Sequence, residues 1–152
     1  MYSEFDTDVE LGYRAWLMSY SIEEIEGIGA AYAEKLRAAG IDKTEQLLDA
    51  CATPKGRAAT AAQTGIAEGH LLRWANMADL MRLKGVGKQY SELLEAAGVD
   101  TVKELRHRNA ANLAARMKEV NDAKNISGAA PTEEMVAGWI AQAKELPARM
   151  EY

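Results

Sequence analysis

The sequence has little of what secreted or membrane-inserted proteins rely on. Cys51 is the single cysteine among 152 residues, so no internal disulfide can form, which fits a reducing compartment. No apolar run approaches the ~20 residues needed to cross a bilayer. The acidic first ten residues lack the basic and apolar regions of a secretory signal. We therefore expect a cytoplasmic protein that does not contact membranes.

Proline residues and runs of β-branched residues are also scarce. Pro54, Pro131 and Pro147 each fall at an expected helix boundary, where the missing N–H does least harm. Ala, Leu, Glu, Lys and Met dominate the remaining segments, and these residues favour helices. The sequence therefore predicts an all-α fold. The net charge of −5 argues against nucleic-acid binding by the whole surface, although a local basic patch remains compatible with it.

Two parts of the sequence match each other. "IEGIGAAYAEKLRAAGI" begins at Ile25 and "LKGVGKQYSELLEAAGV" begins at Leu83, an offset of 58. The surroundings of Trp74 and Trp139 also match, at an offset of 65, so the second copy has seven more residues (65 − 58), which we place in the loop "NDAKNISGAAPT". The chain is thus predicted to be a duplicated unit, divided into an N-terminal extension (1–17), repeat 1 (18–79), repeat 2 (80–146) and a tail (147–152).

Each repeat contains two glycines that flank one aliphatic residue. We call residues 27–29 the first hairpin and residues 85–87 the second hairpin. Glycine allows a tight turn and a close approach of other groups. A helical pattern follows each hairpin directly, and the first N–H groups of a helix have no intrahelical partner. Such a helix start attracts phosphate groups.

Other residues predict where helices begin and end. Gly40 and Gly98 follow periodic apolar segments and suit the left-handed position after a helix. Asp42 and Asp100 come two residues later, and we expect their carboxylates to cap the next helix. Thr132, followed by two glutamates, is expected to cap the last helix.

The hairpins and their flanking residues resemble the helix-hairpin-helix family. The residues that carry the resemblance are Ile22, Ile25, Gly27, Ile28, Gly29, Ala33 and Leu36 in the first copy, and Leu80, Leu83, Gly85, Val86, Gly87, Ser91 and Leu94 in the second. More closely, the chain from about Met18 to Leu146 resembles small bacterial proteins catalogued as a domain of unknown function with tandem helix-hairpin-helix units. The resemblance implies two tandem helix-hairpin-helix repeats in one compact helical domain. For the wider family it implies sequence-independent contacts between hairpin N–H groups and DNA phosphates.

The two hairpins differ in charge. Glutamates surround the first hairpin, and Ala30 follows its second glycine, so we expect it to serve in helix packing only. Lys88 follows the second hairpin, and residues 82–118 contain eight Lys or Arg and four Asp or Glu. Here phosphate binding and an ordinary solvated face are both open interpretations. The candidate nucleic-acid-binding residues are Arg82, Lys84, Gly85, Gly87, Lys88, Arg106 and Arg108.

The N-terminal extension carries a helical pattern of its own. Val9, Tyr13, Trp16, Leu17 and Tyr20 recur on one face of a predicted helix. Such an amphipathic helix can dock in a groove of a partner protein. It can equally pack on its own repeat as an additional lid, and both interpretations stay open.

The sequence offers no catalytic constellation. His70 and His107 lie far apart without carboxylates at metal-ligand spacing, and neither hairpin has the spacing of a dinucleotide or nucleotide phosphate loop. We expect no enzymatic activity, no metal, no cofactor and no small-molecule substrate. Our first expectation is an interaction or adaptor protein that recruits a protein partner through the extension and the bundle surface. The alternative is a weak, sequence-independent DNA-binding protein that uses the second hairpin.

Overall fold

The computed structural model describes residues 19–152. Within that range the chain forms one 3₁₀ turn and eight α-helices, and no strand, so the all-α prediction is confirmed. The elements are η1 (Ile22–Glu24), α2 (Ala30–Ala38), α3 (Thr44–Cys51), α4 (Pro54–Thr64), α5 (Glu68–Leu80), α6 (Lys88–Ala96), α7 (Val102–Leu105), α8 (Ala110–Lys124) and α9 (Glu133–Glu145). None of these helices is both long and apolar enough to cross a membrane.

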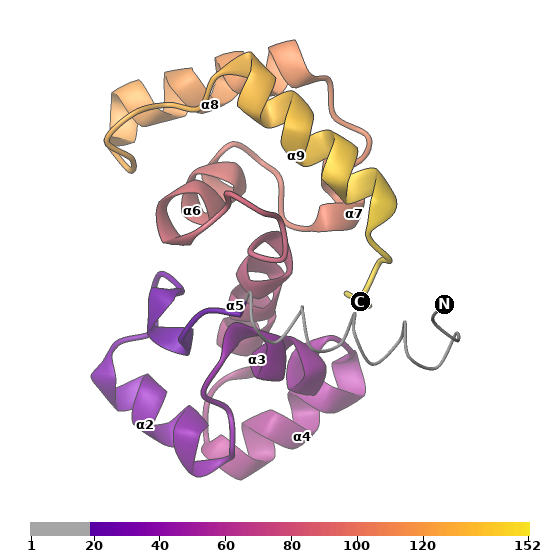
Figure 1. The fold of residues 1–152 in the computed structure, drawn as a ribbon. Coiled ribbons are helices and arrows are strands. Elements are labelled where there is room, and N and C mark those ends of the chain that lie inside the picture. Colours follow the sequence, from indigo (N-terminus) through magenta and orange to yellow (C-terminus); the bar gives the residue numbers. More distant parts are fainter. Residues whose placement is uncertain (1–18) are drawn as a thin grey trace, which may run out of the picture.

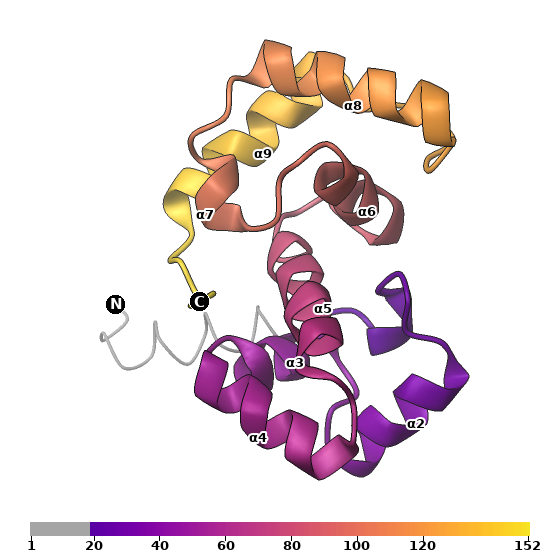
Figure 2. The same cartoon turned by 180° about the vertical axis from the view of Figure 1, so that it is seen from behind.

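The helix α5 occupies the middle of the molecule. Figure 1 shows η1 and α2–α4 on one side of it and α6–α9 on the other, and the reverse view in Figure 2 shows the same division. The buried side chains form two clusters, and α5 contributes to both. Met81, directly after α5, belongs to the first cluster, whereas the adjacent Leu80 belongs to the second. The helices therefore form one compact domain with two cores that meet at α5.

The two glycine hairpins have the same local geometry. Gly27 has a φ of 97° and Gly85 a φ of 92°, a left-handed conformation that side chains disfavour. The following amides, of Ile28 and Val86, each donate to the carbonyl three residues earlier at 3.1 Å. Ile28 and Val86 are both buried, so each hairpin is fixed to its own core by its middle residue.

Several predicted helix ends are confirmed. Gly40 and Gly98 follow α2 and α6 with φ values of 84° and 94°. Thr132 caps α9, and its side-chain oxygen accepts a hydrogen bond from the Met135 N–H at 3.1 Å. These positions were predictable because glycine geometry and hydroxyl capping depend mainly on the adjacent residues.

The predicted caps at Asp42 and Asp100 are wrong. The helices α3 and α7 begin one residue later than an aspartate cap requires, with Lys43 and Thr101 at the cap positions. Asp42 and Asp100 instead donate their backbone N–H groups to side chains four residues on, at 2.8 Å for Gln46 and 2.9 Å for Glu104. The first-turn N–H groups that we expected the aspartates to accept are bonded to hydroxyl groups instead, Glu45 N–H to Ser19 in α3 and Glu104 N–H to Thr101 in α7.

Both the helix and the loop that follows it are longer in the second half than in the first. The helix α8 has 15 residues, whereas α4 in the first half has 11. The loop after α8 covers residues 125–132, against residues 65–67 after α4. The predicted loop "NDAKNISGAAPT" therefore starts too early, because residues 121–124 continue α8.

The last residues return to the first core. We call residues 147–152 the C-terminal strap. Met150 is buried in the first cluster, and the Glu151 N–H donates to the Ala52 carbonyl at 2.8 Å. Arg57 is itself buried and donates to the Glu151 carbonyl at 2.9 Å. The strap thus connects the end of the second half to α3 and α4 of the first.

Candidate functional site

The second hairpin presents an uncapped helix start. The helix α6 begins at Lys88, its N-cap is Gly87, and no side chain of the described residues accepts from its first N–H groups. The N–H groups of residues 88–90 therefore have no intrahelical partner. Lys84 and Lys88 are both exposed on either side of the hairpin. Two ammonium groups and a helix start together favour an anion.

Two side chains of α9, Gln142 and Trp139, contact the second hairpin. The side-chain Oε1 of Gln142 accepts a hydrogen bond from the Lys84 N–H at 2.8 Å, and its Nε2 donates to the Lys84 carbonyl at 3.2 Å. The indole of Trp139 lies against Gly85, where a Cβ would come within 3.4 Å of Nε1. Sequence reasoning did not identify Gln142, although a polar residue at the position that Met77 occupies in the first half was a usable signal.

Two of the predicted arginines have internal partners. Arg82 Nη1 pairs with the buried carboxylate of Asp79 at 2.8 Å, and Arg82 Nη2 donates to the Pro147 carbonyl at 2.9 Å. Arg106 donates to the carbonyls of Ala143, at 2.7 Å, and Leu146. These guanidinium groups therefore stabilise the end of α9 and the start of the C-terminal strap.

The structure does not bring Arg108 to the second hairpin. Its Nη1 lies 3.5 Å from the Gly98 carbonyl, just beyond the C-terminal end of α6. Lys88 lies at the other end of this nine-residue helix, about 13 Å away along its axis. Of the seven predicted residues, Lys84, Gly85, Gly87 and Lys88 form one surface, and the three arginines lie outside it.

The first hairpin has the same uncapped helix start but different surroundings. Gly29 is the N-cap of α2, again without a side-chain hydrogen bond from the described residues. Trp74 lies against Gly27 as Trp139 lies against Gly85. The ring of Tyr32 contacts Trp74 with centroids 4.9 Å apart, and His70 stacks on the same indole at 5.5 Å. Apolar packing and glutamates rather than lysines therefore surround this hairpin, although the Arg73 guanidinium also lies near Gly27, 3.6 Å from where a Cβ would be.

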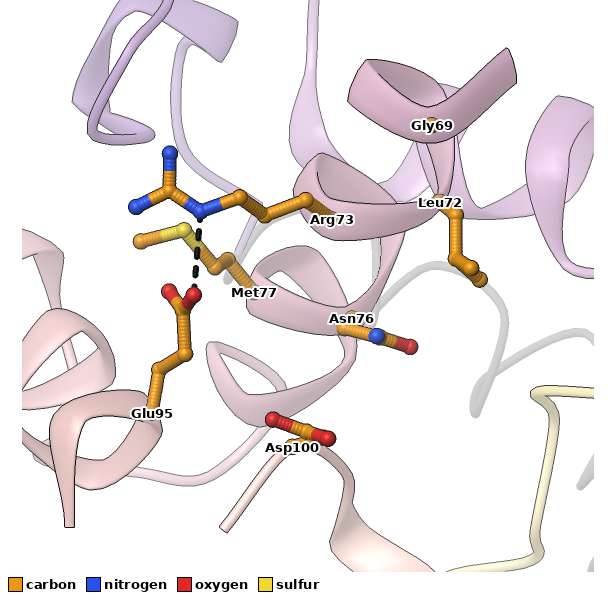
Figure 3. A pocket seen from close by; sticks show the side chains of 7 residues that line it. All are labelled: Gly69, Leu72, Arg73, Asn76, Met77, Glu95 and Asp100. Atoms are coloured by element: carbon orange, nitrogen blue, oxygen red, sulfur yellow. Dashed lines mark hydrogen bonds and ion pairs between the residues drawn. The ribbon is translucent and has the colours of Figure 1, made fainter. Parts of the chain in front are cut away.

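A cavity of about 230 Å³ lies between α5 and α6 (Figure 3). Arg73 from α5 and Glu95 from α6 form an ion pair across it at 2.9 Å. Asp100 lines the same cavity, and burial, together with the charges of Glu104 and Glu95, raises the pKa of its carboxyl group. This surface is acidic and therefore unsuited to phosphate. Among residues 19–152, no group of three His, Cys, Asp or Glu side chains is placed to hold a metal ion.

The predicted partner-binding residues Val9, Tyr13, Trp16 and Leu17 lie outside the described residues. Tyr20 is described, and it packs half-buried against the first core. The adjacent Ser19 accepts a hydrogen bond from the Glu45 N–H at 2.9 Å, at the start of α3. Tyr20 is therefore part of the folded unit.

These residues define a small all-helical domain with two buried cores and two equivalent glycine hairpins, one of them lysine-flanked. The chain belongs to the family described as Domain of unknown function (DUF4332), whose model matches residues 26–146. The predicted membership of a family of unknown function is thereby confirmed. Neither the curated proteins nor the solved structures contain a significant match to the chain.

Proposed function

We propose that this protein is a non-enzymatic, sequence-independent nucleic-acid-binding protein that contacts backbone phosphates through its second hairpin. The observation that carries the proposal is the position of exposed Lys84 and Lys88 beside the uncapped start of α6. Free amide groups and lysine side chains recognise phosphate oxygens without reading bases. The buried, unpaired thiol of Cys51 suits a cytoplasmic setting.

The first hairpin supports this assignment as an internal comparison. It has the same backbone turn, yet Glu26 and Ala30 stand where the second hairpin has Lys84 and Lys88. Helix packing alone would not require this difference, because both lysines are exposed. The charge difference therefore favours a role for the second hairpin beyond packing.

We expect the binding to be weak and strongly dependent on salt. Arg82 and Arg106 have internal partners, so Lys84, Lys88 and the α6 amides provide few phosphate contacts. Each phosphate that is neutralised contributes about −0.9 to the slope of log affinity against log salt for duplex DNA. A slope near −2 corresponds to two lysine contacts.

The experiment is a titration of a short fluorescent duplex at about 50 mM and about 200 mM salt. The double variant Lys84→Glu/Lys88→Glu should abolish binding, because it places two carboxylates beside the phosphates. Lys35→Glu/Lys55→Glu is the matched control, since both lysines are exposed, on α2 and α4, and the change in net charge is the same. If the wild-type protein does not bind at the lower salt concentration, or if the double variant binds equally well, the proposal fails.

A second candidate function is an adaptor that recruits a protein partner through the N-terminal extension. The hydrogen bonds of Ser19 and Tyr20 to Thr44 and Glu45 favour it, because they fix the point where the extension leaves the domain. The described surface favours it less, since Met135 and Tyr152 are its only exposed large hydrophobic side chains. Affinity capture with and without residues 1–17 tests this function, and an unchanged set of captured proteins would exclude it.

A further inference from the structure

The side chain of Gln142 distinguishes the second hairpin from the first. Its amide group makes two hydrogen bonds to the backbone of Lys84, the residue directly before Gly85. One side chain thereby satisfies both polar backbone groups at the start of the turn. Because Gln142 belongs to the 13-residue helix α9, these bonds attach the hairpin to a regular element of the second core.

The first hairpin cannot be held in this way. At the offset of 65, Met77 stands at the position of Gln142, and its buried thioether has no amide group to bond with the backbone of Glu26. The indoles at the two hairpins, Trp74 and Trp139, occupy equivalent places. The two hydrogen bonds from Gln142 and the flanking lysines therefore occur together at the second hairpin. Neither feature is present at the first hairpin.

The two hydrogen bonds from Gln142 fix the backbone position from which the Lys84 side chain extends. Both hydrogen bonds involve Lys84 itself, so its Cα is held while its side chain remains exposed. Lys88 follows four residues later, across a turn whose middle residue, Val86, is fully buried. A turn that is already ordered loses less conformational entropy when a phosphate binds.

We propose that Gln142 is a positioning residue that holds the second hairpin ready for the phosphate backbone. This inference rests on the proposed function of that hairpin. Gln142 contacts the hairpin backbone and contributes no charge of its own. It therefore acts on affinity through the order of the turn and leaves the number of phosphate contacts unchanged.

The test compares Gln142→Met, which copies the first half, with wild type in the duplex titration. We expect about a tenfold loss of affinity, of the size that ordering one loop side chain and its backbone can account for. The salt slope should stay the same, because Lys84 and Lys88 remain. Gln63→Met is the matched control, since Gln63 is exposed on α4.

Amide hydrogen exchange at Lys84 provides a readout that does not depend on binding. Exchange at this amide should become faster in Gln142→Met while α8 and α9 keep their protection. The side chain of Gln142→Asn is one methylene too short to reach the Lys84 backbone, so this variant should behave like Gln142→Met. It serves as a second test if the methionine side chain packs against the hairpin and keeps it ordered.

The outcomes separate the two proposals. If wild type binds and Lys84→Glu/Lys88→Glu does not, the proposed function stands. If Gln142→Met then binds like wild type, or loses affinity with a changed salt slope, the role of Gln142 is overturned. If wild type does not bind, both proposals are overturned.

Discussion

The carboxylate of Asp79, near the end of α5, accepts a hydrogen bond from the N–H of Val102, the first residue of α7, at 2.8 Å. Its other oxygen pairs with Arg82, and the aspartate side chain is 1% exposed. In the first half the corresponding N–H, of Thr44, donates to the Tyr20 carbonyl at 2.8 Å. In the second half the acceptor is thus the Asp79 carboxylate, whereas in the first half it is a backbone carbonyl.

Replacing Asp79 should destabilise the protein strongly. Asp79→Ala leaves the Val102 amide without its acceptor and the Arg82 guanidinium without its carboxylate partner, and such losses in a buried pair cost about 3 kcal/mol or more. Urea denaturation measures the free energy of unfolding. Asp122→Ala is the control, because the Asp122 ion pair with Lys118 is mostly exposed and should contribute less than about 1 kcal/mol. Equal effects of the two substitutions would contradict the prediction.

The two hairpin glycines should differ in their tolerance of alanine. Both have positive φ, which costs an alanine about 1 kcal/mol or more. A Cβ at Gly27 would lie 3.1 Å from Trp74 Nε1, whereas one at Gly85 would lie 3.4 Å from Trp139 Nε1. Thermal denaturation should therefore show a larger loss for Gly27→Ala than for Gly85→Ala.

The helical Gly69 is the control for these two substitutions. A Cβ at this position meets nothing within 4 Å. Gly69→Ala should therefore raise the melting temperature, because alanine favours the helix by up to about 1 kcal/mol. A loss of stability in this variant would contradict our account of the hairpin glycines.

The C-terminal strap should contribute through its methionine more than through its ion pairs. Met150 is buried in the first core, so Met150→Ala should lower the free energy of unfolding by about 2 kcal/mol. Arg149 pairs with Glu45 and Asp49, but these groups are partly exposed, so Arg149→Ala should cost less than about 1 kcal/mol. Denaturation of the two variants at moderate salt checks this order, and the reverse order would refute it.

Cys51 should react slowly in the native protein. Burial raises the pKa of its thiol, although a hydrogen bond with Thr60 opposes the shift. Because the reactive thiolate is disfavoured, alkylation by iodoacetamide should be slow until denaturant is added. The folded state also retains the thiol proton to higher pH, so the free energy of unfolding should fall as pH rises past the usual thiol pKa of about 8.5.

Cys51→Ala provides the control for the pH effect. This variant has no thiol to titrate, so its stability should not show the additional fall above about pH 8.5. Fast alkylation of the native wild-type protein would contradict the burial of Cys51.

Local sequence rules predicted the helices and many of their ends. Gly40, Gly98 and Thr132 behave as expected because their effect depends on the residues beside them. The caps at Asp42 and Asp100 were wrong because the hydroxyl groups of Ser19 and Thr101 accept first-turn N–H groups of α3 and α7. Ser19 lies 26 positions before Glu45, so the sequence alone does not reveal their contact.

The candidate site was predictable only where it is contiguous in sequence. Lys84 and Lys88 lie at the second hairpin because they adjoin its glycines. Arg82 and Arg106 are long enough to turn towards carbonyls of residues 143–147, and nothing in the sequence shows that those carbonyls are near. The position of Gln142 behind the hairpin likewise follows from the packing of α9, which brings together residues 58 positions apart.

The position of α5 between the two cores bears on whether each half can fold without the other. Its residues Leu71 and Trp74 form part of the first core, whereas Leu80 at its end belongs to the second. A cut before α5 would remove several buried side chains from the first core, and a cut after it would remove Leu80 from the second. We therefore expect that neither half folds stably without the other.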